Sequence, residues 1–255
     1  MTRAAAIERV DRHLSWACLV VLAACAPGSA QPSESQQSGE SPQPFRYLEM
    51  QSAGAAPSDR LPLVVALHGR GDRPEWFAGL FDGFATPARI VVPHPPHRFG
   101  DGLAWYLGSW QSSRGRTQIA RELVAHAARI RATVEAVTRA RPTRGRPVVM
   151  GFSQGAMLAY TIALTQPDAF AAAFPISGFF YRETPLPARI DPARIPRIVA
   201  WHGRADRLVT LADDRRGVDA LRARGISVEL REHDAAHTIP APIRRDLLTE
   251  ITSTF

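Results

Sequence analysis

The sequence contains no lysine, only two cysteines and no long apolar run. Because all 31 basic residues are arginine, a pattern typical of GC-rich codon usage, the formal charge of +7 does not by itself indicate a nucleic-acid partner. Two cysteines cannot form a disulfide framework or a four-thiolate zinc site. The short apolar runs exclude a polytopic membrane protein, and an apolar content of 45% excludes a wholly disordered chain. A globular protein of one domain, or at most two, remains.

The first 24 residues have the features of a secretory signal peptide. Arg3, Arg9 and Arg12 precede the apolar run Leu14–Ala24, whose 11 residues are too few for a spanning helix of roughly 20. The segment Leu22-Ala23-Ala24-Cys25 resembles the lipobox of bacterial lipoproteins. That resemblance implies cleavage before Cys25 and a lipid on its thiol. The alternative is an ordinary secretory signal with a chance cysteine.

Residues 25–44 are expected to be a tether behind the lipidated Cys25. Residues 26–44 contain only Ala, Pro, Gly, Ser, Gln and Glu, which bury too little surface to fold and would span roughly 25 Å as a flexible coil. We therefore expect a protein of the bacterial cell envelope, extracytoplasmic and held at a membrane only by its lipid anchor. Many Gram-negative bacteria use an Asp after the lipidated cysteine to retain lipoproteins at the inner membrane, so Ala26 favours the outer one.

From Phe45 onward, apolar strand patterns alternate with amphipathic helical patterns, which predicts one α/β domain over residues 45–255 with a mostly parallel sheet and helices on both faces. The predicted strands are Phe45–Met50, Leu61–Leu67, Ile90–Val92, Val148–Met150, Phe170–Phe174, Ile198–Trp201 and Ile226–Leu230. The predicted helices are Thr117–Ala140, Gln154–Gln166, Leu211–Arg224 and Ile243–Phe255.

The turn Gly151-Phe152-Ser153-Gln154-Gly155 fits the pattern G-x-S-x-G. It follows an apolar strand and opens a helix, which is the context of a nucleophile elbow. Such a turn exposes the serine oxygen at the edge of a sheet and directs the positive end of the helix at it. Ser153 is therefore the candidate nucleophile.

A serine nucleophile needs a base and an orienting acid, which follow it in the order acid and then histidine in this kind of sheet. Asp206 lies in the turn after the strand Ile198–Trp201 and is the expected acid. The base is His233 or His237, and His237 is favoured because it lies in the loop before the last helix. The other groups considered are His202, expected to be structural, and the solvated or turn carboxylates Asp213, Asp214, Asp219 and Asp234.

The oxyanion formed in acyl transfer needs backbone N–H donors, one after the nucleophile and one from an earlier loop. Gln154 supplies the first position. The second lies in Leu67-His68-Gly69-Arg70-Gly71-Asp72, directly after a buried strand, where Arg70 is the candidate donor. Neither an HExxH motif nor a close ligand pair on a helix was identified, so no metal site and no cofactor are expected.

Together, LHGRGD, GFSQGAM, HGRADRLV and AHT resemble the phospholipase/carboxylesterase family of α/β-hydrolases, to which acyl-protein thioesterases belong. The resemblance covers roughly residues 60–255. It implies an α/β-hydrolase fold with no lid domain, with Ser153, Asp206 and His237 as triad and Arg70 and Gln154 as oxyanion donors. Two positions depart from the family pattern, Arg70 in place of a small or apolar residue and Ala236 in place of glycine.

The sequence thus predicts a monomeric serine hydrolase that cleaves small or short-acyl carboxylic esters, with thioesters as a further substrate class. No nucleic-acid partner is expected. The alternatives are a serine peptidase or acyltransferase on the same triad, and a non-catalytic binding lipoprotein. The leaving group and the acceptor are selected by loops, so the motifs do not separate these enzymes.

Overall fold

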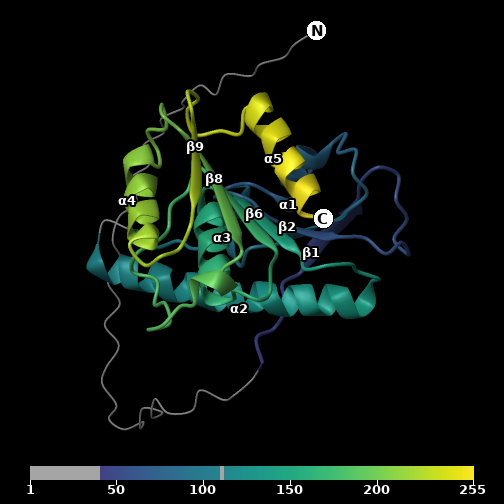
Figure 1. The fold of residues 1–255 in the computed structure, drawn as a ribbon, viewed down its shortest axis with the longest axis horizontal. Helices are drawn as coiled ribbons and strands as arrows, with labels where there is room; N and C mark the ends of the chain where they lie inside the picture. The colour runs from purple at the N-terminus through teal and green to yellow at the C-terminus, as the bar shows by residue number, and fades with distance from the viewer. Residues whose placement is uncertain (1–40, 110–111) are drawn as a thin grey trace, which may run out of the picture. The chain divides into compact units, whose positions relative to one another are not determined.

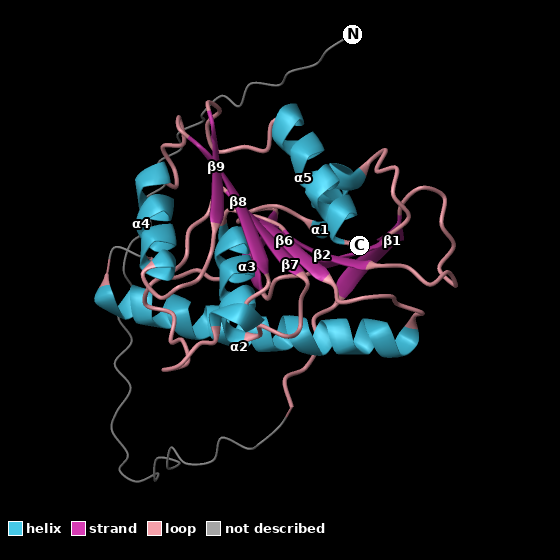
Figure 2. Ribbon diagram, viewed as in Figure 1, coloured by secondary structure: helices cyan, strands magenta, loops and turns pink. Residues whose placement is uncertain are grey.

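The computed structural model describes residues 41–109 and 112–255. The predicted signal peptide, the lipidation site Cys25 and the tether up to residue 40 lie outside the described residues. Residues 41–255 form one folded unit, in which helices flank a central sheet (Figures 1 and 2). Among the described residues, no helix combines the length and the apolar content that a membrane span requires.

The central sheet has seven strands in the order β1-β3-β2-β6-β7-β8-β9. Its strands are β1 Tyr47–Gln51, β2 Leu63–Leu67, β3 Arg89–Pro93, β6 Val148–Phe152, β7 Ala172–Ile176, β8 Arg197–Gly203 and β9 Glu229–His233. β1 runs antiparallel to β3, and all other neighbours are parallel. The carboxyl ends of β6, β8 and β9 therefore meet at one edge of the sheet, which is where α/β sheets place their sites.

Helices cover both faces of the sheet, as the alternating pattern predicted. They are α1 Pro74–Phe77, α2 Ser113–Ala140, α3 Gln154–Thr165, α4 Leu211–Arg222 and α5 Ala241–Thr254, with short 3₁₀ turns η1 Ala78–Phe81 and η2 Pro192–Arg194. Buried side chains of α2, α3 and α4 pack on one face, and those of α1, η1 and α5 pack on the other. Successive residues of β2 alternate between these two cores, since strand side chains alternate in direction. This arrangement confirms the predicted α/β class, with a mostly parallel sheet and helices on both faces.

Two predicted strands are displaced along the chain. The run at 170–174 forms its strand at Ala172–Ile176, and the run at 226–230 forms it at Glu229–His233. In both cases the leading apolar residues are buried before the strand begins, as Phe170 and Ile226 show with at most 1% exposure. The apolar runs correctly indicated buried residues. The positions of β7 and β9, however, are set by their hydrogen bonds to β6 and β8.

A small two-stranded sheet was not predicted. It consists of β4 His97–Phe99 and β5 Gly102–Ala104, paired antiparallel. Leu103 of β5 accepts a backbone hydrogen bond from Gly71 (2.7 Å) and donates one to Asp72 (2.9 Å). The β4–β5 hairpin therefore braces the loop that follows β2.

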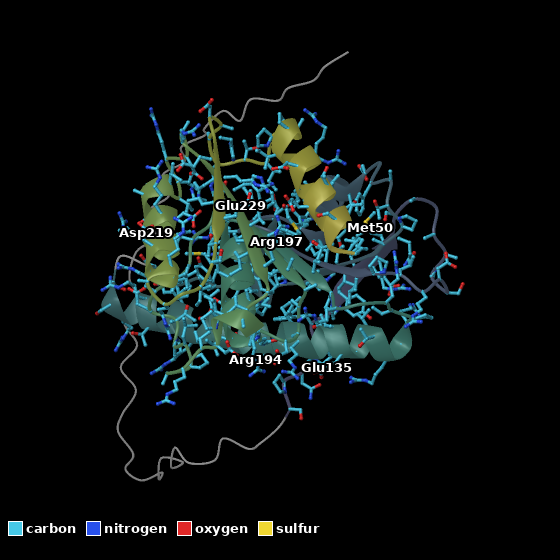
Figure 3. The ribbon with its side chains drawn as sticks, viewed as in Figure 1. Met50, Glu135, Arg194, Arg197, Asp219 and Glu229 are labelled. Atoms are coloured by element: carbon cyan, nitrogen blue, oxygen red, sulfur yellow. The ribbon has the colours of Figure 1, made fainter. Side chains whose placement is uncertain are left out.

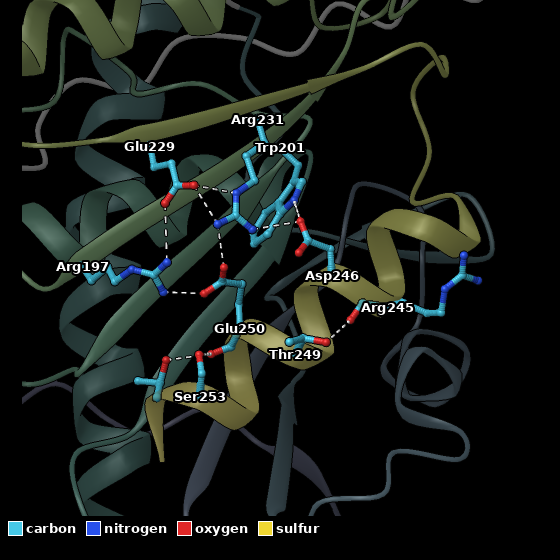
Figure 4. Close-up of polar contacts among 10 residues, drawn as sticks. Arg197, Trp201, Glu229, Arg231, Arg245, Asp246, Thr249, Glu250 and Ser253 are labelled. Carbon is cyan, nitrogen blue, oxygen red and sulfur yellow. Dashed lines mark hydrogen bonds and ion pairs between the residues drawn. The ribbon is translucent and has the colours of Figure 1, made fainter.

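Ion pairs tie α5 to the last two strands of the sheet. Figure 3 shows Arg197 and Glu229 beside each other on neighbouring strands, and Figure 4 shows Arg231 at the centre of the network. Arg231 pairs with Asp246 at 2.9 Å and with Glu250 at 2.6 Å, both from α5. This network therefore joins α5 to β9, the strand that precedes the loop carrying His237.

Candidate active site

The turn between β6 and α3 holds Ser153 in an unusual backbone conformation. Its φ is 56° and its ψ is −116°, in a region that non-glycine residues rarely adopt. The Ser153 N–H donates to the Ile176 carbonyl at 2.9 Å, which holds the turn against β7. The elbow predicted from G-x-S-x-G is therefore present as a strained strand-turn-helix junction.

The two glycines of the motif are required by close backbone packing. A Cβ on Gly151 would lie 2.1 Å from the Gly155 carbonyl oxygen, and a Cβ on Gly155 would lie 2.0 Å from the Leu67 carbonyl oxygen. Contacts this short cannot be relieved by moving a side chain, because the neighbours are backbone atoms. The glycines thus let α3 begin directly against the end of β2.

His237 lies within hydrogen-bond distance of the serine. Its Nε2 is 2.9 Å from Ser153 Oγ, and its ring packs against Phe152 with centroids 4.8 Å apart. The preceding loop sits against the end of β8, where a Cβ on Gly203 would lie 2.1 Å from the Ala235 carbonyl oxygen. The base loop can therefore approach the sheet edge only because Gly203 has no side chain.

Asp206 completes the hydrogen-bonded chain. His237 Nδ1 donates to Asp206 Oδ2 at 2.6 Å, and Asp206 Oδ1 accepts the N–H groups of Leu208 and Val209, each at 2.9 Å. The Asp206 side chain is fully buried, and that of His237 is 17% exposed. A buried carboxylate with three donors is fixed in place and orients the imidazole.

The other histidine considered as base, His233, is not in contact with Ser153. Its Nδ1 accepts the Ala235 N–H at 3.3 Å, within the loop that leads to His237. The Arg204 N–H donates to the His233 carbonyl at 2.7 Å, joining the acid turn to the end of β9. His233 therefore lies in the framework of the base loop.

His202 belongs to a buried network behind the acid. Its Nδ1 is 2.9 Å from Asp214 Oδ2, and its Nε2 donates to the Val209 carbonyl at 2.9 Å, with Asp206 Oδ2 3.6 Å away. Burial alone would lower the pKa of His202, but the hydrogen bond and charge of Asp214 raise the pKa above its ordinary value of 6.5. His202 thus supports the turn that carries Asp206, and Asp214, predicted as solvated, is buried.

Arg70 and Gln154 occupy the expected oxyanion positions. Both line the pocket at Ser153, and Gln154 is the first residue of α3, where helix N–H groups have no intrahelical partner. Within residues 41–109 and 112–255, neither backbone N–H donates to another protein group. The Arg70 guanidinium lies over the Phe99 ring, 5.0 Å from its centroid.

The Gln154 side chain is buried and fastens a second loop to the elbow. Its Oε1 accepts the Trp105 N–H and its Nε2 donates to the Tyr106 carbonyl, both at 3.0 Å. Trp105 Nε1 in turn donates to the His68 carbonyl at 2.9 Å. These bonds hold the loop after β5 against both predicted oxyanion segments.

A pocket of about 400 Å³ opens at the serine. Its polar members are Gly69, Arg70, Ser153, Gln154 and His237. Its apolar wall is formed by Phe99, Tyr106, Phe152, Met157, Leu208 and Val209. Four of the five predicted site residues, Arg70, Ser153, Gln154 and His237, therefore line one predominantly apolar pocket, and the fifth, Asp206, is hydrogen-bonded to His237.

The sequence analysis assigned none of these wall residues to the site, although some of them lie inside the quoted motifs. Phe152 and Met157 belong to GFSQGAM, and Leu208 and Val209 follow the acid in HGRADRLV. Phe99 has no such signal, because its hairpin was not predicted.

The sequence analysis overlooked one close pair of potential metal ligands on a helix. Glu122 and His126 lie four residues apart on α2 and meet His97 of β4.

The family model described as Phospholipase/Carboxylesterase matches residues 51–253. A protein of Oryza sativa subsp. japonica, named a probable inactive carboxylesterase, is 27% identical over 198 residues, which are 70% of this chain and 78% of the relative. 

Two solved structures show the same fold. The crystal structure of esterase PE8 has a TM-score of 0.65 at 23% identity and covers 83% of this chain and 99% of that one. Zea mays acyl-protein thioesterase 2 has a TM-score of 0.61 at 19% identity and covers 82% of this chain and 99% of that one. With the family model spanning most of its length, the chain belongs to the phospholipase/carboxylesterase family of α/β-hydrolases.

Proposed function

We propose that this protein is a serine hydrolase that cleaves carboxylic esters through an acyl-enzyme on Ser153. The observation that carries the proposal is the continuous hydrogen-bonded chain from Ser153 Oγ through His237 to Asp206, at 2.9 Å and 2.6 Å. Because one relative is named a probable inactive carboxylesterase, family membership alone does not establish activity. The intact chain of three side chains at an open pocket supports it.

Acylation begins with proton transfer. His237 Nε2 takes the proton of Ser153 as its oxygen attacks the ester carbonyl carbon, and the buried charge of Asp206 stabilises the imidazolium that forms. The carbonyl oxygen becomes an oxyanion and accepts the Arg70 and Gln154 N–H groups. Collapse of this intermediate breaks the bond to the alcohol, which takes the proton from His237 as it leaves.

Deacylation repeats the same steps with water. His237 removes a proton from water, which attacks the acyl-enzyme carbonyl, and the second oxyanion uses the same two donors. Its collapse releases the carboxylic acid and returns the proton to Ser153 Oγ. A thioester would follow the same route with a thiol as leaving group.

The pocket supports small or short-acyl substrates. At about 400 Å³ it lies toward the small end of ligand sites, and its wall is mostly apolar. In the described residues, the elements are the sheet, its flanking helices and the β4–β5 hairpin, with no separate lid domain. We therefore expect the highest kcat/KM on short acyl chains.

A p-nitrophenyl ester series from acetate to palmitate tests the activity and the acyl preference. Ser153→Ala and His237→Ala should each lower kcat by a factor on the order of 10⁴ to 10⁶, because triad members act as a unit. His233→Ala is the matched control and should retain most of the activity. A fluorophosphonate probe should label Ser153 and no residue of the Ser153→Ala protein. Full activity of Ser153→Ala, or a preference for palmitate, would contradict the proposal.

We also propose that the enzyme is lipid-anchored at Cys25 in the bacterial envelope, at the outer membrane. The proposal rests on the lipobox-like sequence before Cys25, which lies outside the described residues. One acyl chain gives only marginal membrane binding, so stable anchoring requires Cys25 to carry more than one acyl chain. Cys25→Ser should stop fractionation with membranes in the producing cell. A mature N-terminus at any residue other than 25 would refute the anchor and leave the esterase proposal untouched.

A further inference from the structure

A second cluster of chemically capable side chains lies apart from the triad. It contains His97 at the start of β4 and Glu122 and His126 on α2. Glu122 and His126 are four residues apart and therefore share one face of the helix. One potential ligand atom from each of the three side chains lies within 4.8 Å of the other two.

His126 presents a buried nitrogen with nothing to bind. The residue is 6% exposed, and its Nε2 lies 2.8 Å from the Trp105 carbonyl oxygen. Since a carbonyl only accepts, Nε2 carries the proton and Nδ1 of the neutral ring carries a lone pair. Within the described part of the chain, Nδ1 is buried and has no hydrogen-bond partner. A histidine whose other ring nitrogen donates to a carbonyl is the usual arrangement of a metal ligand.

Glu122 likewise has one hydrogen-bonded atom and one buried atom without a hydrogen bond. Its Oε1 accepts a hydrogen bond from Gln118 Nε2 at 2.7 Å, whereas its Oε2 is buried without a hydrogen-bond partner among the described residues. Glu122 Oε2 lies 3.4 Å from His97 Nε2, longer than an ordinary N–H···O hydrogen bond. The carboxylate is thus oriented, with one oxygen left to bind.

A simple ion pair between His97 and Glu122 accounts for only part of this arrangement. That ion pair engages Glu122 Oε2, but it leaves the lone pair of His126 Nδ1 buried without a hydrogen-bond partner among the described residues. A cation would satisfy both acceptors at once. Two imidazoles and one carboxylate suit Zn²⁺, whereas Ca²⁺ and Mg²⁺ prefer all-oxygen sites. We propose that His97, Glu122 and His126 form a zinc site in which water takes the remaining position.

The site requires a small closure. In this structure the three ligand atoms lie up to 4.8 Å from one another. Zinc–ligand bonds of about 2.0–2.2 Å require the ligand atoms to lie closer together than that. His97 can supply the movement, because its side chain is 34% exposed and lies on a short hairpin. Glu122 and His126 are fixed by α2 and by their own hydrogen bonds.

Zinc at this position would fasten the β4–β5 hairpin to α2. Phe99 of the hairpin lines the pocket at Ser153, and Leu103 is hydrogen-bonded to Gly71 and Asp72 beside Arg70. The ion would therefore hold a pocket wall and the loop of one oxyanion donor. None of its ligands contacts Ser153 or His237, so the ion takes no part in the bond-making steps.

Cobalt binding tests the site without any substrate. The chain is used without an affinity tag and with any free cysteine thiol alkylated, so that thiols cannot bind metal. Titration with Co²⁺ should give one equivalent with the intense visible bands of four- or five-coordinate cobalt, and Zn²⁺ should displace it. Zinc at a hundred times its Kd should raise the Tm by about 5–10 °C.

Two substitutions of partly exposed ligands avoid the risk that a change at buried His126 unfolds the chain. His97→Ala and Glu122→Gln should each weaken cobalt binding by at least about 10- to 100-fold, the loss caused by removing even an outer-shell partner. Both should also abolish the Tm rise with zinc. His94→Ala is the matched control, because His94 lies three residues from His97 and pairs with Glu75 at 3.6 Å.

The proposal is overturned if the wild-type chain shows no stoichiometric cobalt spectrum. It is also overturned if His97→Ala and Glu122→Gln bind as tightly as the wild type, or if His94→Ala loses binding equally. Because binding is measured without an ester, its failure and the failure of the esterase proposal are separate results.

Discussion

Replacing Asp206 by asparagine should reverse the proton positions in the proposed triad while preserving its shape. Oδ1 of Asp206 accepts two backbone N–H groups, from Leu208 and Val209 at 2.9 Å each. The asparagine oxygen would keep that place, since only an oxygen can accept both. Its NH₂ group would then stand where Oδ2 now accepts from His237 Nδ1 at 2.6 Å.

Two donors cannot share that contact, so His237 would shift its proton to Nε2. The ring would then donate to Ser153 Oγ across the 2.9 Å contact and could no longer accept its proton. Loss of the base in this way costs a factor on the order of 10⁴ in kcat, or about 5.5 kcal/mol of transition-state stabilisation. KM should change little, because the apolar wall of the pocket is untouched.

The assay is hydrolysis of p-nitrophenyl acetate, with circular dichroism and Tm as checks of folding. Asp213→Asn is the matched control, because it removes the same charge from a carboxylate that is 37% exposed at the start of α4. That control should keep near wild-type kcat. If folded Asp206→Asn keeps more than about a tenth of the wild-type kcat, Asp206 does not set the tautomer of His237 and this reasoning is wrong.

Three further outcomes are expected. Gly155→Ala places a methyl group 2.0 Å from a carbonyl oxygen of β2 and should lower the Tm by roughly 6–12 °C, whereas Gly79→Ala, whose nearest contact is 3.6 Å, should change it little. Asp214 raises the pKa of His202 in the folded protein, so protonated His202 stabilises the fold below pH 6.5, and this contribution is lost as the pH rises through the folded pKa. The free energy of unfolding of the wild type in urea should therefore exceed that of His202→Gln most at pH 5, and the difference should shrink towards pH 9. Arg231→Met should lower stability by about 1–2 kcal/mol and make it less dependent on salt, measured by urea unfolding at low and high ionic strength.

The candidate nucleophile and acid positions could be predicted because each follows a strand whose apolar run is visible in the sequence. Ser153 follows β6 and Asp206 follows β8, and parallel strands bring their carboxyl ends to one edge. His237 was favoured over His233 because it lies farther into the loop, and the structure brings His237 alone of these two to Ser153. These inferences needed only local pattern and chain order.

Strand β9 shows why pattern alone was insufficient elsewhere. Its residues Glu229–His233 are mostly charged, so the strand was predicted at Ile226–Leu230, where the apolar residues lie. The strand lies there because it pairs with β8 and because Arg231 reaches Asp246 and Glu250 on α5. Those partners are distant in sequence, and no local periodicity reveals them.

The β4–β5 hairpin is the clearest case of this limit. Arg70 could be predicted as an oxyanion donor because it lies in a glycine-rich loop directly after a buried strand. The residue under its guanidinium, Phe99, lies on a three-residue strand with no motif. Yet the hairpin lines the pocket through Phe99, braces the oxyanion loop through Leu103 and carries His97 to α2. Since the proposed triad sets only the reaction, we expect acyl selection to depend on this short hairpin, whose position is fixed by its tertiary contacts.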